Sequence, residues 1–175
     1  NRECETGPEG EKMKNFSPSM MISIDTREQR PFLFLGYPCE TSRATLHTAD
    51  YSIAGHENEV CIERKEIDDI VACCMGERER FKSELERMST FQAAAIVVES
   101  PLAAIRRGKY HSKINPVSVE QSLLSFSFKY RIPIYFGQNR LHAENIAFNC
   151  LRHFYNHTVE PRFKVGYISM PLRIT

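Results

Sequence analysis

The sequence predicts a single α/β domain in which a central mixed β-sheet is flanked by helices on both faces. Short apolar runs come first in a meander and then alternate with helical patterns, which is typical of a mixed sheet. The 175 residues are enough for one well-buried domain and too few for two of ordinary size. A hydrophobic content of 42% with 26% charged residues is that of a soluble globular protein.

The N-terminal half predicts a strand meander. MMISID (20–25) is an apolar run that closes on an acid, as expected of a strand buried on both faces. Residues 26–41 carry two prolines and a glycine, so we expect mostly loop there. GHEN (55–58) predicts a hairpin turn between two further strands. The four strands expected here cover residues 20–25, 43–48, 51–54 and 59–64.

Helical and strand patterns alternate in the rest of the domain, which we expect to span residues 20–155. AAAIVVES (93–100) predicts the clearest buried strand, and RRGKYHSKINP (106–116) predicts a polar, basic loop. Residues 1–19 are expected to form a flexible leader and residues 156–175 a loosely structured tail. Helices are expected around 67–71 and 81–88 and at 117–129 and 140–155, with a last strand at 132–136.

The net charge of +1 hides an asymmetry along the chain. Residues 1–100 carry 12 Lys/Arg against 19 Asp/Glu, and residues 101–175 carry 11 against 3, so the balances are −7 and +8. Such a split between halves indicates polyanion binding. Because the overall charge is close to zero, any basic surface must be local.

Neither membrane insertion nor secretion is indicated. No run approaches the roughly 20 apolar residues of a membrane span, and the N-terminal residues lack the apolar core of a secretory signal. The six cysteines show no CxxC pair or repeated metal-ligand spacing. We therefore expect reduced thiols and an intracellular, cytoplasmic protein.

Three acidic residues stand at the ends of apolar strands, namely Asp25, Asp50 and Glu63. Because a hairpin joins the strands that carry Asp50 and Glu63, we expect these two carboxylates side by side. Lys65 follows Glu63 by two residues and shares its strand face, whereas Arg64 points to the other face. Two or three carboxylates can hold Mg²⁺ or Mn²⁺, since both cations prefer oxygen ligands.

A metal at this point would suit phosphodiester hydrolysis, because it polarises a phosphate oxygen and generates a nucleophile from bound water. Lys65 could orient or deprotonate that water and offset the charge of the transition-state phosphate. Arg64 would brace the carboxylates. The alternative is that these charges are only the solvated ends of strands, and the local residues leave both interpretations open.

Four motifs resemble, in order, the nuclease domain of the XPF-type structure-specific endonucleases, which belong to the PD-(D/E)XK restriction-like group. They are DTRE (25–28), ADY (49–51), IERKEIDDI (62–70) and GERERFKSEL (76–85). The match covers residues 20–155, and the single-domain length is similar to small stand-alone members from bacteria and their phages. The resemblance implies a restriction-endonuclease-like domain and metal-dependent cleavage of DNA.

The resemblance also implies a role for each matching residue. Gly76 would provide a strained turn before the second helix, and Ala49 stands where the family usually has glycine. No tandem helix-hairpin-helix domain is seen in these residues, so the fork or flap preference of many relatives does not carry over. The implied catalytic residues are Asp50, Glu63, Arg64 and Lys65; the implied metal ligands are Asp25, Asp50 and Glu63; the implied supporting residues are Glu28, Asp69 and Arg78, with Arg78 facing the DNA or the site.

The basic loop gives a further prediction. Its lysines and arginines could contact phosphates while its aromatic ring stacks on a base, so that the loop would follow a DNA strand. The alternative is an exposed, solvated loop. The residues concerned are Arg106, Arg107, Lys109, Tyr110 and Lys113.

We therefore predict a metal-dependent DNA endonuclease that uses Mg²⁺ or Mn²⁺, needs no small-molecule cofactor, and acts on branched or otherwise structured DNA in repair, recombination or phage DNA metabolism. Two alternatives are a non-catalytic DNA-binding or scaffold partner on the same fold and a restriction-type nuclease that recognises a sequence. Helix 140–155 could present an apolar face to a second copy, forming a homodimer, or bury that face within the chain. A bacterial source would make the protein nucleoid-associated or phage-encoded.

Overall fold

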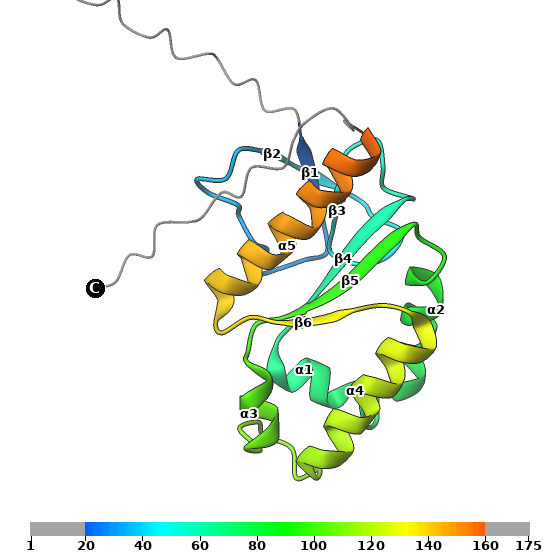
Figure 1. Cartoon of the computed structure of the whole chain (residues 1–175), viewed down its shortest axis with the longest axis vertical. Helices are drawn as coiled ribbons and strands as arrows, with labels where there is room; N and C mark the ends of the chain where they lie inside the picture. Colours follow the sequence, from blue (N-terminus) through cyan, green and yellow to red (C-terminus); the bar gives the residue numbers. More distant parts are fainter. Residues whose placement is uncertain (1–19, 160–175) are drawn as a thin grey trace, which may run out of the picture.

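One mixed sheet of six strands organises the domain. A computed structural model describes residues 20–159, so the predicted leader (1–19) and tail residues 160–175 lie outside the described part. The strands are β1 (Met21–Asp25), β2 (Glu40–Ala44), β3 (Tyr51–Ile53), β4 (Val60–Lys65), β5 (Ala93–Val98) and β6 (Ile134–Phe136). Their order in the sheet is β2-β1-β3-β4-β5-β6 (Figure 1). Neighbouring strands are parallel except for β1–β3 and β3–β4, which are antiparallel.

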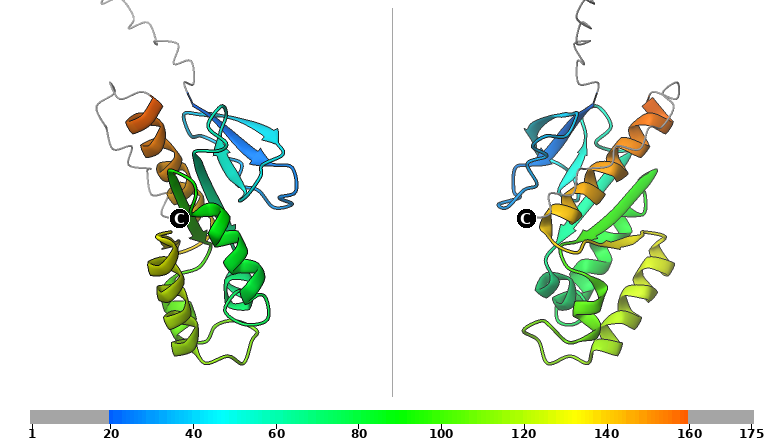
Figure 2. Two further views of the ribbon diagram at one scale, coloured as in Figure 1. Left: turned by 90° about the vertical axis from the view of Figure 1, so that its right-hand side faces the viewer. Right: turned by 60° about the vertical axis from the view of Figure 1, so that its left-hand side comes forward.

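Helices cover both faces of this sheet, as the sequence predicted. The helices are α1 (Ile67–Ala72), α2 (Arg78–Met88), α3 (Leu102–Arg106), α4 (Pro116–Tyr130) and α5 (Arg140–Phe154). One core cluster lies between α5 and the strands β1, β3, β4 and β5. The other lies on the opposite face of the sheet, which the helices α1, α2, α3 and α4 cover. Figure 2 shows α5 lying apart from the other helices in both views.

The apolar run at residues 93–98 is continuous because helices cover strand β5 on both faces. Ala95 and Val97 face α5, whereas Ile96 and Val98 face the other helices, and all four are buried. Successive residues of a strand point to opposite faces, so a strand covered on both sides has no polar positions. The expected hairpin is also present, since β3 pairs with β4 across residues 54–59.

Three boundaries differ from the sequence-based expectation. The strand expected at 43–48 lies at 40–44, where it pairs with β1 at the edge of the sheet and carries mostly polar, exposed residues without an apolar signal. A short helix without a counterpart in the sequence prediction, α3, lies before the expected basic loop and includes its first residue, and its Ile105 is fully buried against the core. A π-helical turn, Tyr155–Val159, continues α5 into the expected tail.

Two helices begin at side-chain caps. The Asn115 side chain accepts a hydrogen bond from the Val117 N–H at the start of α4, and Asn139 accepts one from the His142 N–H at the start of α5. Gly76, in contrast, does not form the strained turn implied by the resemblance. Its φ lies outside the left-handed region, and an added Cβ would meet no atom within 4 Å.

No helix within residues 20–159 is long and apolar enough to cross a bilayer. The cysteines of this range are all free.

Candidate active site

Asp25, Asp50 and Glu63 lie in one row across three neighbouring strands. Ile24 of β1 pairs with Tyr51 of β3, and Tyr51 pairs with Ile62 of β4. Asp25, Asp50 and Glu63 are the next residues along these strands, so they stand opposite one another. The Asp25 N–H donates to the Asp50 carbonyl at 2.8 Å. Since paired residues of antiparallel strands share a face, all three side chains point to the side covered by α1 to α4.

These acids line a cavity of about 660 Å³ between the ends of the strands and α2. The supporting acids Glu28 and Asp69 line the same cavity. All five acids that the sequence or the resemblance singled out therefore meet here. The remaining lining residues are Arg27, Gln29, His47, Thr48, Ala49, Arg80, Glu84 and Arg87.

Asp25 has all its carboxylate oxygens in hydrogen bonds. Oδ1 accepts from the Arg27 backbone N–H (2.7 Å) and Nε (2.9 Å), while Oδ2 accepts from Arg27 Nη2 (2.8 Å) and the Leu46 N–H (2.9 Å). The Arg27 side chain is the main cause that lowers the pKa of Asp25 to about 2. Asp25 is thus ionised and bonded to Arg27 and to the Leu46 N–H, and its role as a metal ligand stays a prediction.

Asp50, which is half-buried, and Glu63, which is buried, form an acid pair. Burial raises the pKa of Asp50 to about 6, although the Arg64 N–H, which donates to its Oδ2 at 2.8 Å, opposes the shift. Burial and then the charge of Asp50 raise the pKa of Glu63 well above its usual range. Two carboxylates held together in a low-dielectric site are costly, and a cation between them would relieve that cost.

Lys65 lies on the same face as Glu63, as predicted. Its ammonium group forms an ion pair with Glu63 and lies 3.5 Å from Glu84 of α2. Burial by itself would lower the pKa of Lys65, but the two carboxylates outweigh burial and raise it. Lys65 is therefore held as a cation next to two carboxylates that line the cavity, Glu63 and Glu84.

Arg64 points to the opposite face, as its strand position predicted. Its side chain is 9% exposed and forms ion pairs with Glu28 (3.1 Å) and Glu99 (2.9 Å). Burial opposes the charged form of Arg64, but hydrogen bonds from its guanidinium to these two carboxylates raise its pKa. Glu28 thus lines the cavity and anchors Arg64 at the same time.

The residues present suit a cation held by two carboxylates better than one held by three. No group of three or more His, Cys, Asp or Glu side chains within residues 20–159 is arranged to hold a metal ion. Mg²⁺ is commonly bound through one or two carboxylates, water and substrate phosphate. Asp50 and Glu63 meet that requirement, and Asp25 supports the site through its contacts with Arg27.

Arg78 does not line the cavity, which is one of the two positions that the resemblance implied, the other being contact with DNA. Its guanidinium carbon lies 4.6 Å from the centre of the Phe126 ring, and Nη1 donates to Ser122 Oγ at 3.0 Å. The reason is helical spacing: Arg80 and Arg87, elsewhere on α2, turn towards the cavity instead. Arg78 therefore joins α2 to α4.

The residues predicted for DNA contact divide into two groups. Arg106 forms an ion pair with Glu120 of α4, and the Tyr110 hydroxyl donates to the Ile114 carbonyl at 2.9 Å while its ring packs on the core. Tyr110 is therefore a support of the loop and is not displayed for base stacking. The other three, Arg107, Lys109 and Lys113, are exposed.

Several cavity residues were not assigned a role from the sequence. Arg80, Glu84 and Arg87 lie on a helix surface that a sequence pattern shows only as charged. Thr48 is 5% exposed, and its hydroxyl has no hydrogen-bond partner among the described residues. Ala49 adopts φ +63°, a left-handed conformation rare for residues other than glycine, which fits the glycine usual at this family position.

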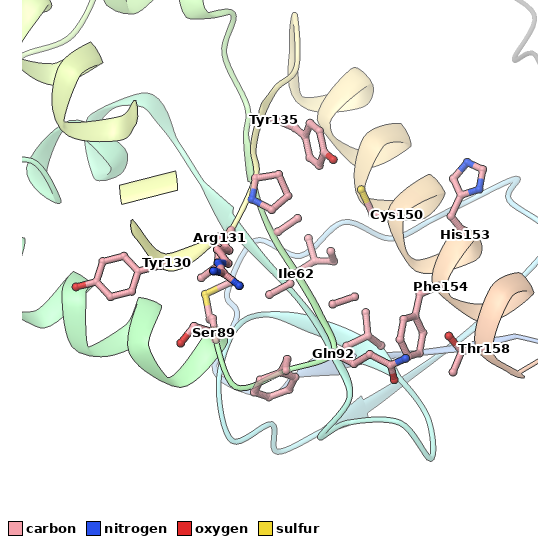
Figure 3. A pocket seen from close by; sticks show the side chains of 18 of the residues that line it. Ile62, Ser89, Gln92, Tyr130, Arg131, Tyr135, Cys150, His153, Phe154 and Thr158 are labelled. Carbon is pink, nitrogen blue, oxygen red and sulfur yellow. The ribbon is translucent and has the colours of Figure 1, made fainter. Parts of the chain in front are cut away.

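A larger groove of about 890 Å³ lies on the α5 face of the sheet, away from the acids (Figure 3). Apolar residues of β4 and β5 form its floor, and Lys129, Arg131 and His153 stand at its sides. Among the described residues that line it, none is Asp or Glu. It therefore offers no carboxylate for a divalent cation.

A model of the ERCC4 domain matches residues 24–150, which include every acid of the cavity. The chain belongs to the ERCC4 domain family. A search of curated proteins finds no match to this ERCC4 domain.

Solved structures show the same fold. XPF from Aeropyrum pernix matches with a TM-score of 0.64 at 16% identity, covering 81% of this chain and 68% of that one. XPF from the same organism, in complex with DNA, matches with a TM-score of 0.62 at 18% identity, covering 83% and 68%. This ERCC4 domain therefore has the fold of an XPF-type, restriction-endonuclease-like nuclease domain, as the sequence motifs implied.

Proposed function

We propose that this ERCC4 domain is a divalent-metal-dependent endonuclease that hydrolyses phosphodiester bonds in DNA. The observation that carries the proposal is the pair of carboxylates at the cavity, half-buried Asp50 and buried Glu63, with the cationic Lys65 paired to Glu63. Family membership supports a nuclease, and the DNA complex of the similar XPF from Aeropyrum pernix supports DNA as the polymer.

Each residue has a distinct task in this proposal. Asp50 and Glu63 would hold Mg²⁺ or Mn²⁺, which when bound polarises a phosphate oxygen and lowers the pKa of a water. Lys65 would offset the negative charge that grows on the phosphate. Arg64 keeps Asp50 in place through its backbone N–H. Arg80 and Arg87, which are exposed at the cavity, would contact flanking phosphates.

The second candidate is a DNA-binding partner without catalysis. The pairing of Asp25 with Arg27 and of Glu63 with Lys65 favours it, because both acids already have a cationic partner. In this case the cavity arginines would bind phosphate and no bond would be cut. The protein would bind DNA with a steep dependence on salt.

A panel of DNA substrates separates these functions. Intact duplex, plasmid, forked and flap DNA would be incubated with EDTA, Mg²⁺ or Mn²⁺ and the wild type, Asp50→Ala, Lys65→Ala or the surface control Lys129→Ala. We expect cation-dependent cleavage that is lost in the first two variants and kept in the control. Full activity of both site variants would sink the assignment, and salt-sensitive binding without cleavage would establish the non-catalytic partner.

The same panel addresses substrate choice. A structure-selective enzyme spares intact duplex and cuts forks or flaps, as we propose for a role in repair, recombination or phage DNA metabolism. A restriction-type enzyme would instead give discrete fragments from plasmid DNA.

Pairing into a homodimer and an intracellular location also belong to this proposal. The apolar face of α5, formed by Ala143, Ala147, Phe148 and Leu151, is buried against the sheet of the same chain. A dimer would therefore use other surfaces, and light scattering over a range of concentrations tests for it.

A further inference from the structure

The charged residues behind the acid pair form a second, buried layer on the α5 side of the sheet. Arg64 lies at its centre, between Glu28 and Glu99, whose side chains are 7% and 10% exposed. Glu66, which is 38% exposed, lies 3.4 Å from Arg64 and contributes from the rim. The charge of Arg64 is thus balanced in part by Glu99, which follows β5 directly and belongs to none of the four sequence motifs.

Glu99 contacts the Arg64–Lys65 segment in two ways. Its side chain accepts a hydrogen bond from Arg64 Nη1 at 2.9 Å, and its backbone N–H donates to the Lys65 carbonyl at 3.0 Å. On the other side of the same segment, the Arg64 N–H donates to Asp50 at 2.8 Å. The peptide that carries Lys65 is therefore fixed from β3 and from the end of β5.

Arg140, the first residue of α5, holds Glu99 from the outer side. Its Nη1 forms an ion pair with Glu99, and its Nη2 donates to the carbonyls of Arg30 (2.7 Å) and Pro31 (2.8 Å). Its guanidinium also lies over the Phe32 ring, 5.0 Å from the centroid. Glu99 is thus tied to a helix start and to the loop after β1, both of which are anchored in the core.

We infer that Glu99 is a positioning residue for the proposed phosphodiester hydrolysis, and this inference rests on the proposed function. Glu99 is not among the residues that line the cavity, so we place it behind the site and not in contact with the substrate. It sets the Arg64–Lys65 peptide, and through it the Asp50 carboxylate and the Lys65 ammonium group, in the arrangement that acts on the phosphate. Without its charge, Arg64 and Arg140 would face each other without the carboxylate between them.

The test compares Glu99→Gln with Glu66→Gln, because both side chains contact Arg64 but only that of Glu99 is largely buried and also pairs with Arg140. A displacement of about 1 Å at a catalytic group can cost on the order of 100-fold in rate. We therefore expect kcat on the best DNA substrate to fall roughly 10- to 100-fold in Glu99→Gln, with KM changed less than about threefold. Glu66→Gln should keep kcat within about threefold. Equal kcat values for the two variants would overturn the inference.

A second measurement does not depend on cleavage. In ¹H–¹⁵N spectra of the metal-free protein, Glu99→Gln should shift the backbone amides of Asp50 and Lys65 and the Arg64 Nε–H signal, whereas Glu66→Gln should leave the Asp50 and Lys65 amides in place. Arg140→Lys serves if Glu99→Gln does not fold, and it should give the same shifts. Unshifted amides in a folded variant would overturn the positioning role. If the wild type cuts no DNA with any cation, the proposed function fails, while these spectra still decide whether Glu99 positions the segment.

Discussion

The guanidinium of Arg78 lies 4.6 Å from the centre of the Phe126 ring and joins α2 to α4. Nη1 of the same side chain donates to Ser122 Oγ at 3.0 Å. Arg78, to which the resemblance assigns a role, therefore has a structural task, and the arginines available to a polyanion are others on α2. Arg80, two residues further on, is exposed and lines the cavity.

This arrangement predicts opposite effects for two neighbouring arginines. Arg78→Ala should lower the free energy of unfolding by about 1–2 kcal/mol, because it removes a cation–π contact and a hydrogen bond, and should leave DNA affinity unchanged. Arg80→Ala should leave stability within about 0.5 kcal/mol and weaken DNA binding. Urea denaturation and fluorescence anisotropy measure the two quantities. A loss of affinity in Arg78→Ala with unchanged stability would contradict the assignment.

Asp50→Asn should stabilise the metal-free protein in a pH-dependent way. The pKa of Asp50 is raised from 3.8 to about 6, so its contribution to stability is fully present below about pH 4 and is lost as pH rises through 6. The uncharged amide avoids this loss and can still accept the Arg64 N–H. We expect a gain of roughly 1–3 kcal/mol at pH 8 and almost none at pH 4. Urea titrations at pH 4, 6 and 8 measure it, and an equal gain at every pH would contradict it.

The same variant reports on the cation. A ligand that binds only the folded state raises the free energy of unfolding. Mg²⁺ or Mn²⁺ should therefore raise the melting temperature of the wild type and have a smaller effect on Asp50→Asn. Asp68→Asn is the control, since Asp68 pairs with His111 outside the cavity. Equal cation effects in all three proteins would speak against Asp50 as a ligand.

Thr48→Val should also stabilise the protein. The hydroxyl is buried without a partner among the described residues, and valine has nearly the same shape, so the desolvation cost of about 1 kcal/mol is removed. Ser52→Ala is the matched control. The Ser52 hydroxyl is equally buried but donates to the Val60 carbonyl at 2.6 Å, so its loss should destabilise. The prediction fails if both variants lose stability to a similar extent.

Two glycines should respond differently to alanine. A Cβ at Gly137 would lie 2.7 Å from the Ala143 backbone nitrogen, so Gly137→Ala forces α5 away from the end of β6. We expect a loss of about 2 kcal/mol or more. Gly76→Ala meets open space and should be neutral or slightly stabilising. Thermal denaturation of the two variants compares them directly, and a neutral Gly137→Ala would show that the contact is relaxed easily.

The sequence predicted those parts of the fold and site that depend on local pattern. Asp50 and Glu63 could be placed side by side because a hairpin of known register joins their strands, and Lys65 shares a face with Glu63 by strand alternation. The edge strand β2 was misplaced because its polar residues pair with β1 without entering the core. Pairing with a neighbour, and not hydrophobicity, decides where such a strand lies.

What could not be predicted depends on contacts between distant segments. The pairing of Arg64 with Glu99 joins residues 35 positions apart, and that of Glu99 with Arg140 joins residues 41 positions apart. No periodicity links them. The ion pair of Asp25 with Arg27 joins residues that are close in sequence, but it could not be predicted either. Which arginine pairs with a given acid depends on side-chain directions, and a pattern of residue types does not contain them.

The position of the Arg64 partners along the chain has a consequence for synthesis. Asp25, Asp50 and Glu63 leave the ribosome early, whereas the residues that hold Arg64 and Glu99 from behind arrive only when Arg140 has been made. Chains emerge from N- to C-terminus, so a nascent or prematurely ended chain would carry the acids without their brace. If the domain cuts DNA as proposed, we expect cutting to begin only when α5 is in place, so that incomplete copies of the protein would be inactive.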